Sequence, residues 1–185
     1  DGERVHLFRD MGLVNQVFTE ESLACLPGYI AVGHTRYSTM GSSRIENAQP
    51  ILVRADIGDL AVAHNGNLVN VPELAEELDR RGQERRVATT DSELIALLAM
   101  SSAGASWPER IRAVVPLLQG AFSLVMCSAT QLIGLRDPLG VRPLVLGRLG
   151  RGWVIASESC ALDTIGAELV RDFEPGEMVV IDRDG

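Results

Sequence analysis

The 185-residue sequence has few aromatic residues and no basic cluster that contains them. Phe, Trp and Tyr make up 4% of the chain, and 17 basic residues are outnumbered by 25 acidic ones, giving a formal net charge of -8. A nucleic-acid-binding surface normally needs a basic patch, often with aromatic residues between the charges. We therefore expect no nucleic-acid partner for this chain.

Cysteine is also scarce, and long apolar runs are missing. Cys25, Cys127 and Cys160 are widely spaced, odd in number and form no C-x-x-C pair, which argues against a disulfide scaffold or a zinc site. We expect Cys127 and Cys160 to be core residues. No apolar run approaches the length of a membrane span and no signal peptide is visible, so we expect no membrane association. The number and spacing of the cysteines favour a reducing compartment, and we expect a cytoplasmic location.

The residues that are present are typical of one globular domain spanning residues 1–185. Short apolar runs between turn-forming residues predict strands at residues 4–9, 29–34, 51–54, 60–63, 121–127, 132–136, 143–147, 153–157, 169–173 and 178–181. Helices are predicted at residues 21–26, 71–81, 91–100 and 107–118. Consecutive strands joined by tight turns indicate antiparallel sheets covered by the central helices, which is an α+β layered fold.

The stretch AVAHNGNLVN, residues 61–70, ends an apolar strand in polar residues. Asn65-Gly66 is typical of a two-residue hairpin turn, but the following residues predict a helix capped by Asn70 rather than a second strand. We interpret residues 64–67 as a strand-to-helix corner, where backbone N–H groups are open to a ligand. The Asn65 amide and the Gly66 N–H are the two kinds of donor that form an oxyanion hole, and an ordinary turn is the alternative.

Two charged residues stand where they could bind a ligand. Arg36 lies near the start of GHTRYSTMGSSRIENAQP, residues 33–50, a polar loop whose length indicates a function, and its guanidinium could bind a carboxylate. Asp91 opens the apolar helix and could bind an ammonium group. The simpler interpretations are a surface arginine and a helix N-cap, and for Asp91 alone the cap is favoured.

His34 and His64 each end an apolar strand, which raises the question of a metal site. No third ligand and no carboxylate pattern accompanies them. Buried, hydrogen-bonded imidazoles are therefore the better interpretation.

A guanidinium, a carboxylate and two oxyanion donors together describe a site for an α-amino acid with a reactive side-chain carbonyl. The motifs that carry these residues are HTRYST, AHNGNLVN, TTDSELI and RDPLGVRPL, in that order. In sequence and spacing they resemble the class II glutamine amidotransferase domain of the amidophosphoribosyltransferases. The resemblance runs nearly end to end, through GAFSLVM, ASESCALDTIGAELVRDFEPGE and VVIDRDG.

The resemblance implies a fold, a reaction and a set of site residues. The fold is that of the N-terminal-nucleophile hydrolases, a four-layer αββα sandwich of antiparallel sheets, here incomplete at the N-terminus. The reaction is hydrolysis of glutamine to glutamate and ammonia. A glutamine loop over residues 36–49 is expected to close over the substrate. The residues carried over by matching motif are Arg36 for the glutamine α-carboxylate, Asp91 for the α-ammonium, Asn65 and Gly66 for the oxyanion, and Tyr37 and Thr39 in the glutamine loop.

The family's nucleophile has no counterpart in this sequence. In the family it is a cysteine at the mature N-terminus, whose own α-amino group serves as the base, whereas residue 1 here is Asp1. Cys25 lies in a predicted helix with no base nearby, so core packing is its favoured interpretation. We predict that these 185 residues alone release no ammonia from glutamine. The motif RDPLGVRPL is interpreted as a structural corner beside the site.

The resemblance also implies partners and cofactors outside this segment. Family members transfer the ammonia to phosphoribosyl pyrophosphate, forming 5-phosphoribosylamine in the first step of purine biosynthesis, through a phosphoribosyltransferase domain that this sequence does not contain. Magnesium belongs to that domain, and some members hold a 4Fe–4S cluster through cysteines that none of the three here matches. We expect no cofactor in this chain, glutamine as its ligand, and a homo-oligomer for the full-length protein.

Two other interpretations stay open. The glutamine–fructose-6-phosphate aminotransferases share the glutaminase half, but they typically carry Trp at the position of Tyr37 and His at the position of Gln49, so the residues here favour the phosphoribosyl acceptor. A glutamine-binding module without a nucleophile would keep Arg36 and Asp91. Because the other site residues are intact, an incomplete enzyme is favoured over a decayed one.

Overall fold

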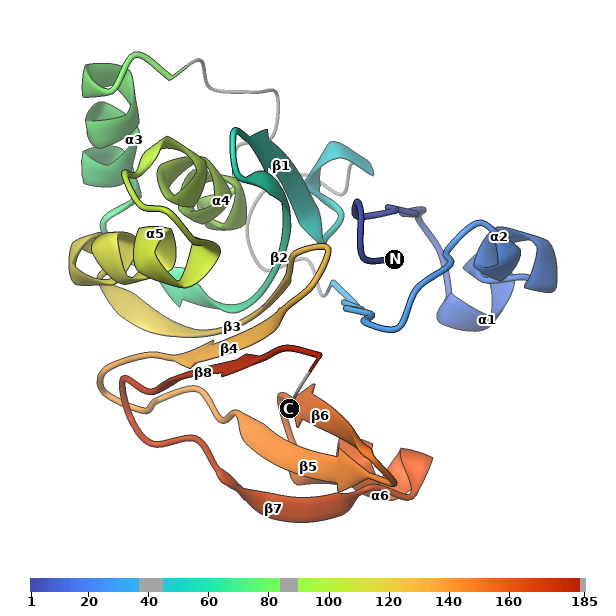
Figure 1. Ribbon diagram of the computed structural model, residues 1–185. Helices are drawn as coiled ribbons and strands as arrows, with labels where there is room; N and C mark the ends of the chain where they lie inside the picture. The colour runs from blue at the N-terminus through green and yellow to red at the C-terminus, as the bar shows by residue number, and fades with distance from the viewer. Residues whose placement is uncertain (37–44, 84–89, 184–185) are drawn as a thin grey trace.

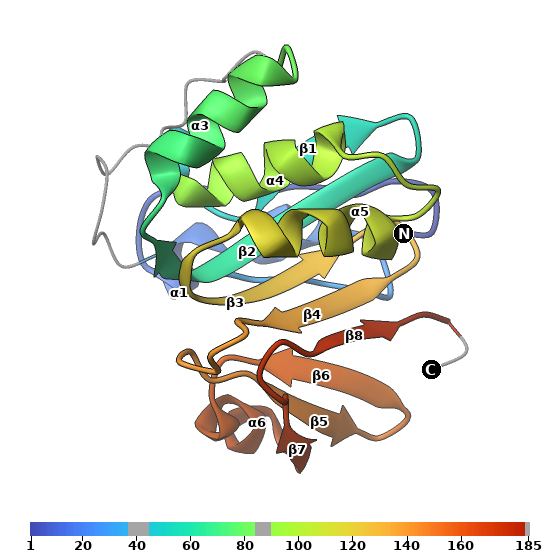
Figure 2. The same ribbon diagram turned by 90° about the vertical axis from the view of Figure 1, so that its left-hand side faces the viewer.

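A computed structural model describes residues 1–36, 45–83 and 90–183, and these residues form four layers (Figures 1 and 2). In this part of the chain the larger sheet has the strand order β1-β2-β3-β4-β8 and the smaller sheet the order β6-β5-β7, with every neighbouring pair antiparallel. The strands are β1 Ile51–Ala55, β2 Gly58–Leu68, β3 Gly120–Cys127, β4 Leu132–Arg136, β5 Val145–Leu149, β6 Gly152–Ala156, β7 Glu168–Asp172 and β8 Met178–Ile181. The helices are α1 Val14–Val17, α2 Glu20–Ala24, α3 Val71–Arg80, α4 Asp91–Ser101, α5 Trp107–Val114 and α6 Ser159–Ile165, with 3-10 turns η1 Ile45–Asn47 and η2 Val115–Leu117.

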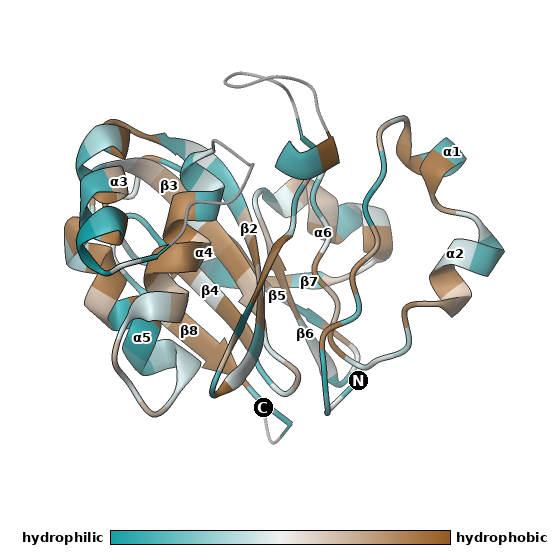
Figure 3. Cartoon of the chain, turned by 90° about the horizontal axis from the view of Figure 1, so that it is seen from above, coloured by the Kyte–Doolittle hydropathy of each residue, from teal (hydrophilic) through white to brown (hydrophobic). Residues whose placement is uncertain are grey.

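Helices α3, α4 and α5 cover one face of the larger sheet (Figure 2). Alternate residues of β2, including Leu60 and Val62, point toward these helices and share one core cluster with Phe122 and Leu124 of β3. Apolar residues run along α4, whereas the outer helix α3 is mainly hydrophilic (Figure 3). Helix α4 is buried on nearly every side, as expected for a helix whose residues are apolar all round.

The two sheets pack face to face through a second cluster. Leu144, Leu146 and Phe173 are buried in it against Val125 of β3. Gly134 of β4 lies at this contact, where a Cβ would stand 2.7 Å from the Phe173 ring. The missing side chain therefore allows the sheets to approach closely.

Helix α6 forms the fourth layer. Leu162 of α6 packs against Val145 and Ala167 in a third cluster, on the outer face of the smaller sheet. Three clusters of buried apolar residues thus separate four layers, each sheet having one helix-covered face and one face toward the other sheet. This arrangement confirms the predicted α+β, αββα sandwich.

The predicted corner at residues 64–67 is wrong, because β2 continues to Leu68. β1 and β2 form a hairpin, and β3 then pairs with β2 from Ala61 to Leu68. Hydrogen bonds to a strand that is distant in sequence hold the backbone extended and override the turn preference of Asn65-Gly66.

Two predicted strands, at residues 4–9 and 29–34, are also wrong. Neither segment forms a strand or pairs with one in the described part of the chain, and their residues are exposed or half-buried. An apolar alternation forms a strand only where another backbone supplies hydrogen-bond partners. The connection between these segments contains α1 and α2, which lie to one side of the sheets (Figure 1).

Three residues that precede helices differ in whether their side chains cap the helix. Ser106 caps α5 through a hydrogen bond from the N–H of Glu109 in its first turn. Thr90 caps α4, so the interpretation of Asp91 as the cap is wrong and its carboxylate makes other contacts. Asn70 precedes α3 as predicted, but its side chain binds the carbonyl of Leu117 and the N–H of Gln119 instead of capping.

The cysteines divide between core and surface. Cys127 is buried as predicted, and burial raises the pKa of its thiol to about 11. Cys25 and Cys160 are exposed, so the core prediction is wrong for both. Cys25 follows α2, which stands apart from the sheets, and Cys160 lies near the start of α6 (Figure 1). Across the three described ranges, no helix has the length and apolar content needed to cross a membrane.

Candidate active site

The site predicted from the sequence lies at one edge of β2. β1 pairs with β2 only as far as Val62, whereas β3 pairs with it as far as Leu68. Residues 64–68 therefore have a neighbouring strand on one side only. On the other side this edge is approached by the side chains of Gln49 and His34 and by the N-terminus of α4.

Side chains accept hydrogen bonds from two backbone N–H groups along this edge. The His64 N–H donates to Gln49 Oε1 at 2.6 Å, and the Leu68 N–H donates to Asp91 Oδ2 at 3.2 Å. Alternate residues of an antiparallel strand direct their N–H groups to the same edge. The Gly66 N–H therefore lies on this edge, between the residues that bind Gln49 and Asp91.

Gly66 is also required by the packing of the sheet. A Cβ at this position would lie 2.2 Å from the carbonyl oxygen of Ala121, 2.6 Å from Phe122 Cα and 2.8 Å from His64 Nε2. Two of these three neighbours are backbone atoms, which cannot move aside as a flexible side chain can. Glycine at this position therefore has a structural reason that is independent of any ligand.

Asn65 lies on the face of β2 that is turned toward the smaller sheet. It stands directly opposite Ser123 of β3, and opposite residues of an antiparallel pair share one face. Ser123 is 3% exposed, and its hydroxyl has no hydrogen-bond partner among the described residues. The Asn65 side chain is half-buried and makes no hydrogen bond within the same ranges. Two polar side chains thus lie together at this end of the strand without a described partner.

Asp91, the first residue of α4, turns its carboxylate toward β2. Its Oδ1 accepts the Ser92 N–H at 2.9 Å and lies 3.5 Å from His64 Nδ1, while Oδ2 accepts the Leu68 N–H. Burial acts to raise the pKa of this carboxyl, but the hydrogen bond and charge of His64 and the two N–H donors outweigh it, so the pKa is lowered. The helix N-terminus also favours the anion. Asp91 is therefore ionised at neutral pH.

Arg36 borders the same polar cluster. It lines a cavity of about 160 Å³ together with His34, Thr35 and Gln49. His34 Nε2 lies 3.1 Å from the carbonyl oxygen of His64. Burial lowers the pKa of His34, its hydrogen bond to His64 raises it, and the charges of His64 and Arg36 lower it further, so the net shift is downward. Arg36 thus lines the same cavity as a residue that touches β2.

The predicted site residues that the structure describes lie in the polar cluster around His64 or next to it. They come from the end of the segment before residue 37, from β2 and from the first residue of α4. The predicted site residues within the described ranges are Arg36, Asn65, Gly66 and Asp91, and Tyr37 and Thr39 lie outside those ranges.

Gln49 and Ser92 are two members of this cluster that the sequence analysis does not assign to the site. Gln49 Nε2 donates to Ser92 Oγ at 3.0 Å, and the same oxygen lies 3.2 Å from His64 Nδ1. These contacts join three segments that are far apart in sequence, so no local pattern reveals them. The sequence offers only an indirect indication of these two residues, because Ser92 follows Asp91 directly and Gln49 ends the predicted glutamine loop.

The interpretation of His34 and His64 as buried, hydrogen-bonded imidazoles is confirmed in part. Each ring has one bonded nitrogen, but His34 Nδ1 and His64 Nε2 are buried without a partner among the described residues. In the same part of the chain, no group of three or more His, Cys, Asp or Glu side chains could hold a metal ion.

The motif RDPLGVRPL forms a tight corner at the same end of the larger sheet. The Asp137 N–H donates to the carbonyl of Phe122, the residue of β3 that pairs with Gly66. Asp137 is 0% exposed. Its carboxylate accepts hydrogen bonds of 3.0–3.2 Å from the N–H groups of Leu139, Val141 and Arg142. These bonds confirm the structural interpretation of the motif.

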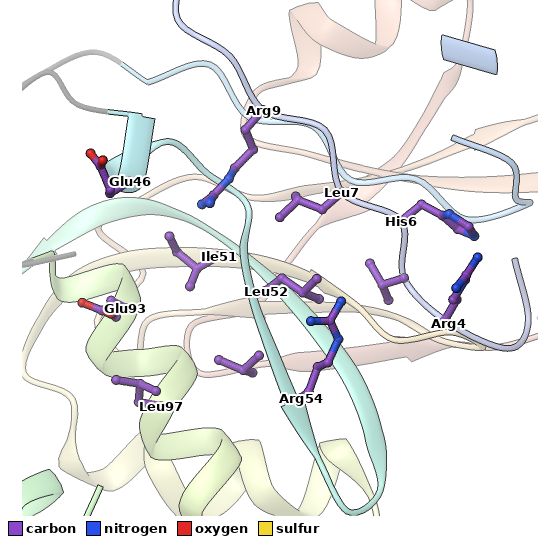
Figure 4. A pocket seen from close by; sticks show the side chains of 12 residues that line it. Arg4, His6, Leu7, Arg9, Glu46, Ile51, Leu52, Arg54, Glu93 and Leu97 are labelled. Carbon is purple, nitrogen blue, oxygen red and sulfur yellow. The ribbon is translucent and has the colours of Figure 1, made fainter. Parts of the chain in front are cut away.

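A cavity of about 790 Å³ lies elsewhere, between residues 4–9, β1 and α4 (Figure 4). Its basic side chains include Arg4, Arg9 and Arg54. None of the four described site residues lines it. Cavity size therefore does not locate the predicted site, which is defined by the polar contacts along β2.

The fold and this polar edge together define the class of protein. A family model described as a glutamine amidotransferase domain matches residues 34–164, which include every residue of the predicted site. The chain belongs to this family.

Similar curated proteins are amidophosphoribosyltransferases. The one from Synechococcus elongatus is 53% identical over 187 residues, which cover 98% of this chain and 38% of that protein. The one from Mycobacterium leprae is 48% identical over 191 residues, covering 100% of this chain and 34% of that protein. This chain therefore spans a little over a third of the length of these relatives.

Solved structures support the fold. Glutamine phosphoribosylpyrophosphate amidotransferase from B. subtilis, complexed with ADP and GMP, matches with a TM-score of 0.91 at 38% identity, covering 100% of this chain and 40% of that one. A glutamine aminotransferase class-II domain protein from Silicibacter pomeroyi matches with a TM-score of 0.54 at 20% identity, covering 77% of this chain and 68% of that one, and shares the fold alone. The predicted N-terminal-nucleophile hydrolase fold is confirmed.

Proposed function

We propose that this chain is the glutamine-hydrolysing part of an amidophosphoribosyltransferase. It would release ammonia from glutamine for transfer to phosphoribosyl pyrophosphate, giving 5-phosphoribosylamine, the first step of de novo purine biosynthesis. The observation that carries the proposal is the free edge of β2, where the Gly66 N–H lies between residues bound to Gln49 and Asp91. The 53% identity to an amidophosphoribosyltransferase favours this acceptor over fructose 6-phosphate.

Glutamine would be held at its amino-acid end by two opposite charges. The lowered pKa of Asp91 keeps its carboxylate ionised and able to bind the α-ammonium group. Arg36 would bind the α-carboxylate, for which a planar guanidinium can supply two parallel hydrogen bonds. Tyr37 and Thr39 belong to the same proposal as parts of the glutamine loop, on the strength of the motif alone.

The amide carbonyl would then lie at the edge of β2. When a nucleophile attacks this carbonyl, negative charge develops on its oxygen, and preorganised donors stabilise it. The Gly66 N–H is fixed by strand geometry, and the half-buried Asn65 amide is the neighbouring side-chain donor. The nucleophile in the family is an N-terminal cysteine, so the inactivity of these 185 residues alone stays a prediction. The magnesium and iron–sulfur assignments likewise stay predictions from the resemblance.

Two substitutions in the full-length protein test the proposal. Asn65→Ala should cost about 2.7–4 kcal/mol of transition-state stabilisation, seen as a fall of roughly 10²–10³ in kcat for glutamine hydrolysis with KM little changed. Arg36→Lys should chiefly raise KM for glutamine, because an ammonium cannot reproduce the planar fork.

Steady-state ammonia release from glutamine measures both parameters. The rate with free ammonia as the nitrogen donor is the control, since it bypasses amide hydrolysis. Equal changes of kcat and KM in both variants would contradict the assigned roles. Glutamine binding without ammonia release by the full-length wild-type protein would instead support a binding module.

A further inference from the structure

We propose that Gln49 is a positioning residue, which fixes the free edge of β2 so that the oxyanion donors at residues 65 and 66 are correctly aimed. The inference rests on the proposed glutaminase function and extends it to a residue that does not touch the substrate in that proposal. Its basis is the set of hydrogen bonds made by one carboxamide.

The Gln49 side chain pairs with the backbone of His64 as a residue of a neighbouring strand would. Its Oε1 accepts the His64 N–H at 2.6 Å, and its Nε2 lies 3.4 Å from the His64 carbonyl oxygen. β1 has stopped pairing with β2 two residues earlier, at Val62. The carboxamide therefore continues the hydrogen bonding of the sheet at the point where its backbone partner ends.

The same carboxamide ties β2 to the helix that carries Asp91. Gln49 Nε2 donates to Ser92 Oγ at 3.0 Å, and this hydroxyl also contacts the imidazole of His64 at 3.2 Å. Because Ser92 is in the first turn of α4, the bond sets the distance between the strand edge and the Asp91 carboxylate. These contacts thus fix the position of the proposed ammonium-binding group relative to the proposed oxyanion donors.

Both ends of the segment that begins near Arg36 also meet at His64. The His34 ring contacts the His64 carbonyl from the start of the segment, and Gln49 contacts the same carbonyl from its end. An oxyanion donor must lie within a few tenths of an ångström of its productive position, and a misplacement of about 1 Å can lower the rate roughly 10²-fold. Loss of the Gln49 contacts would free the strand edge immediately before the donors.

Two substitutions of Gln49 in the full-length protein separate positioning from general stability. Gln49→Ala removes the donor and the acceptor. Gln49→Glu keeps the volume and an acceptor for the His64 N–H, but it replaces the donor to Ser92 by an anion near Asp91. We expect either change to lower kcat for glutamine hydrolysis by about 10- to 100-fold, with KM for glutamine within about threefold of wild type.

The rate with free ammonia as nitrogen donor should not change in either variant, because that reaction bypasses amide hydrolysis. Gln16→Ala is the matched control, since Gln16 is exposed and is not among the residues that line the cavity beside Arg36 and Gln49, and it should give wild-type values throughout.

Three results would overturn the inference. A kcat within about twofold of wild type in both variants would show that Gln49 positions nothing that matters for turnover. A rise in KM for glutamine alone would show that Gln49 contributes to substrate binding and not to turnover. A parallel loss of the ammonia-dependent rate, or failure of both variants to fold, would reduce it to a stabilising residue. Failure of the proposed function itself would appear differently, as wild-type protein that releases no ammonia from glutamine.

Discussion

At the scale of single residues, Gly66 meets two requirements at once. Its position against Ala121 and Phe122 leaves no room for a side chain, and its N–H lies on the free edge of β2. The first requirement concerns folding and the second concerns the proposed oxyanion hole. Because both fall on one residue, the presence of glycine in the motif does not by itself demonstrate a catalytic role.

Gly66→Ala should therefore destabilise the fold as well as impair the proposed reaction. A methyl group 2.2 Å from the carbonyl oxygen of Ala121 forces the paired strands apart, and overpacking of this kind costs about 1–3 kcal/mol or more. The free energy of unfolding from urea titration measures the effect. Gly152→Ala is the control, since the nearest atom to its added Cβ would be 3.5 Å away. Equal stabilities of the two variants would contradict the close packing of β2 against β3.

At the scale of structural elements, the corner between β4 and β5 is held by its own side chains. Arg136 donates to the carbonyls of Gly140, Arg142 and Phe173 from one side. Asp137, on the other side, accepts from three N–H groups of the same corner. The corner therefore keeps its shape although Leu139 within it is 78% exposed.

Asp137→Ala should loosen this element. The substitution leaves three N–H groups without their acceptor, at a cost of about 1–3 kcal/mol for each group that water does not reach. A lowered midpoint of urea unfolding, together with faster amide hydrogen exchange in residues 139–142, is the expected outcome. Asp163→Ala, at an exposed position of α6, should leave both measurements unchanged. Unaltered exchange in the Asp137 variant would show that the backbone alone sets the corner.

At the scale of the whole molecule, the polar cluster makes the fold sensitive to acid. The pKa of His34 is lowered, chiefly by burial, so the folded state binds this proton less tightly than the unfolded state does. The pKa of Asp91 is lowered too, because His64 and two N–H donors outweigh the effect of burial. Both shifts favour the forms present at neutral pH.

Stability should accordingly fall in two steps as the pH decreases. Below the ordinary His pKa of 6.5 the unfolded state takes up a proton that folded His34 resists, so stability is lost from 6.5 down to the lowered folded value. The contribution of Asp91 is present above the ordinary pKa of 3.8 and is lost as the pH falls through its lower folded pKa. Urea unfolding at about pH 8 and about pH 5.5 measures the first step. His34→Gln should reduce it, and an unchanged pH dependence in that variant would contradict the role of His34.

Much of the architecture could be predicted from local pattern. The ends of β4 and β8 are as predicted, and α4 is buried as its continuous apolar run indicates. Asn65, Gly66 and Asp91 could be proposed as site residues because small or polar residues follow or precede apolar runs at these positions. Whether residues 4–9 and 29–34 form strands could not be decided from the sequence, since apolar alternation does not reveal whether a partner strand exists.

The sequence by itself determined the order of β1 to β8 and of α3, α4 and α5, because side-chain periodicity is a local property of the chain. Tertiary structure alone decided that β2 continues through residues 64–68, because the partner that holds it extended is β3. The same pairing directed the Gly66 N–H to the free edge. It also brought Gln49 and Ser92 to His64 from separate segments, since a hydrogen bond depends on distance in space and not along the chain.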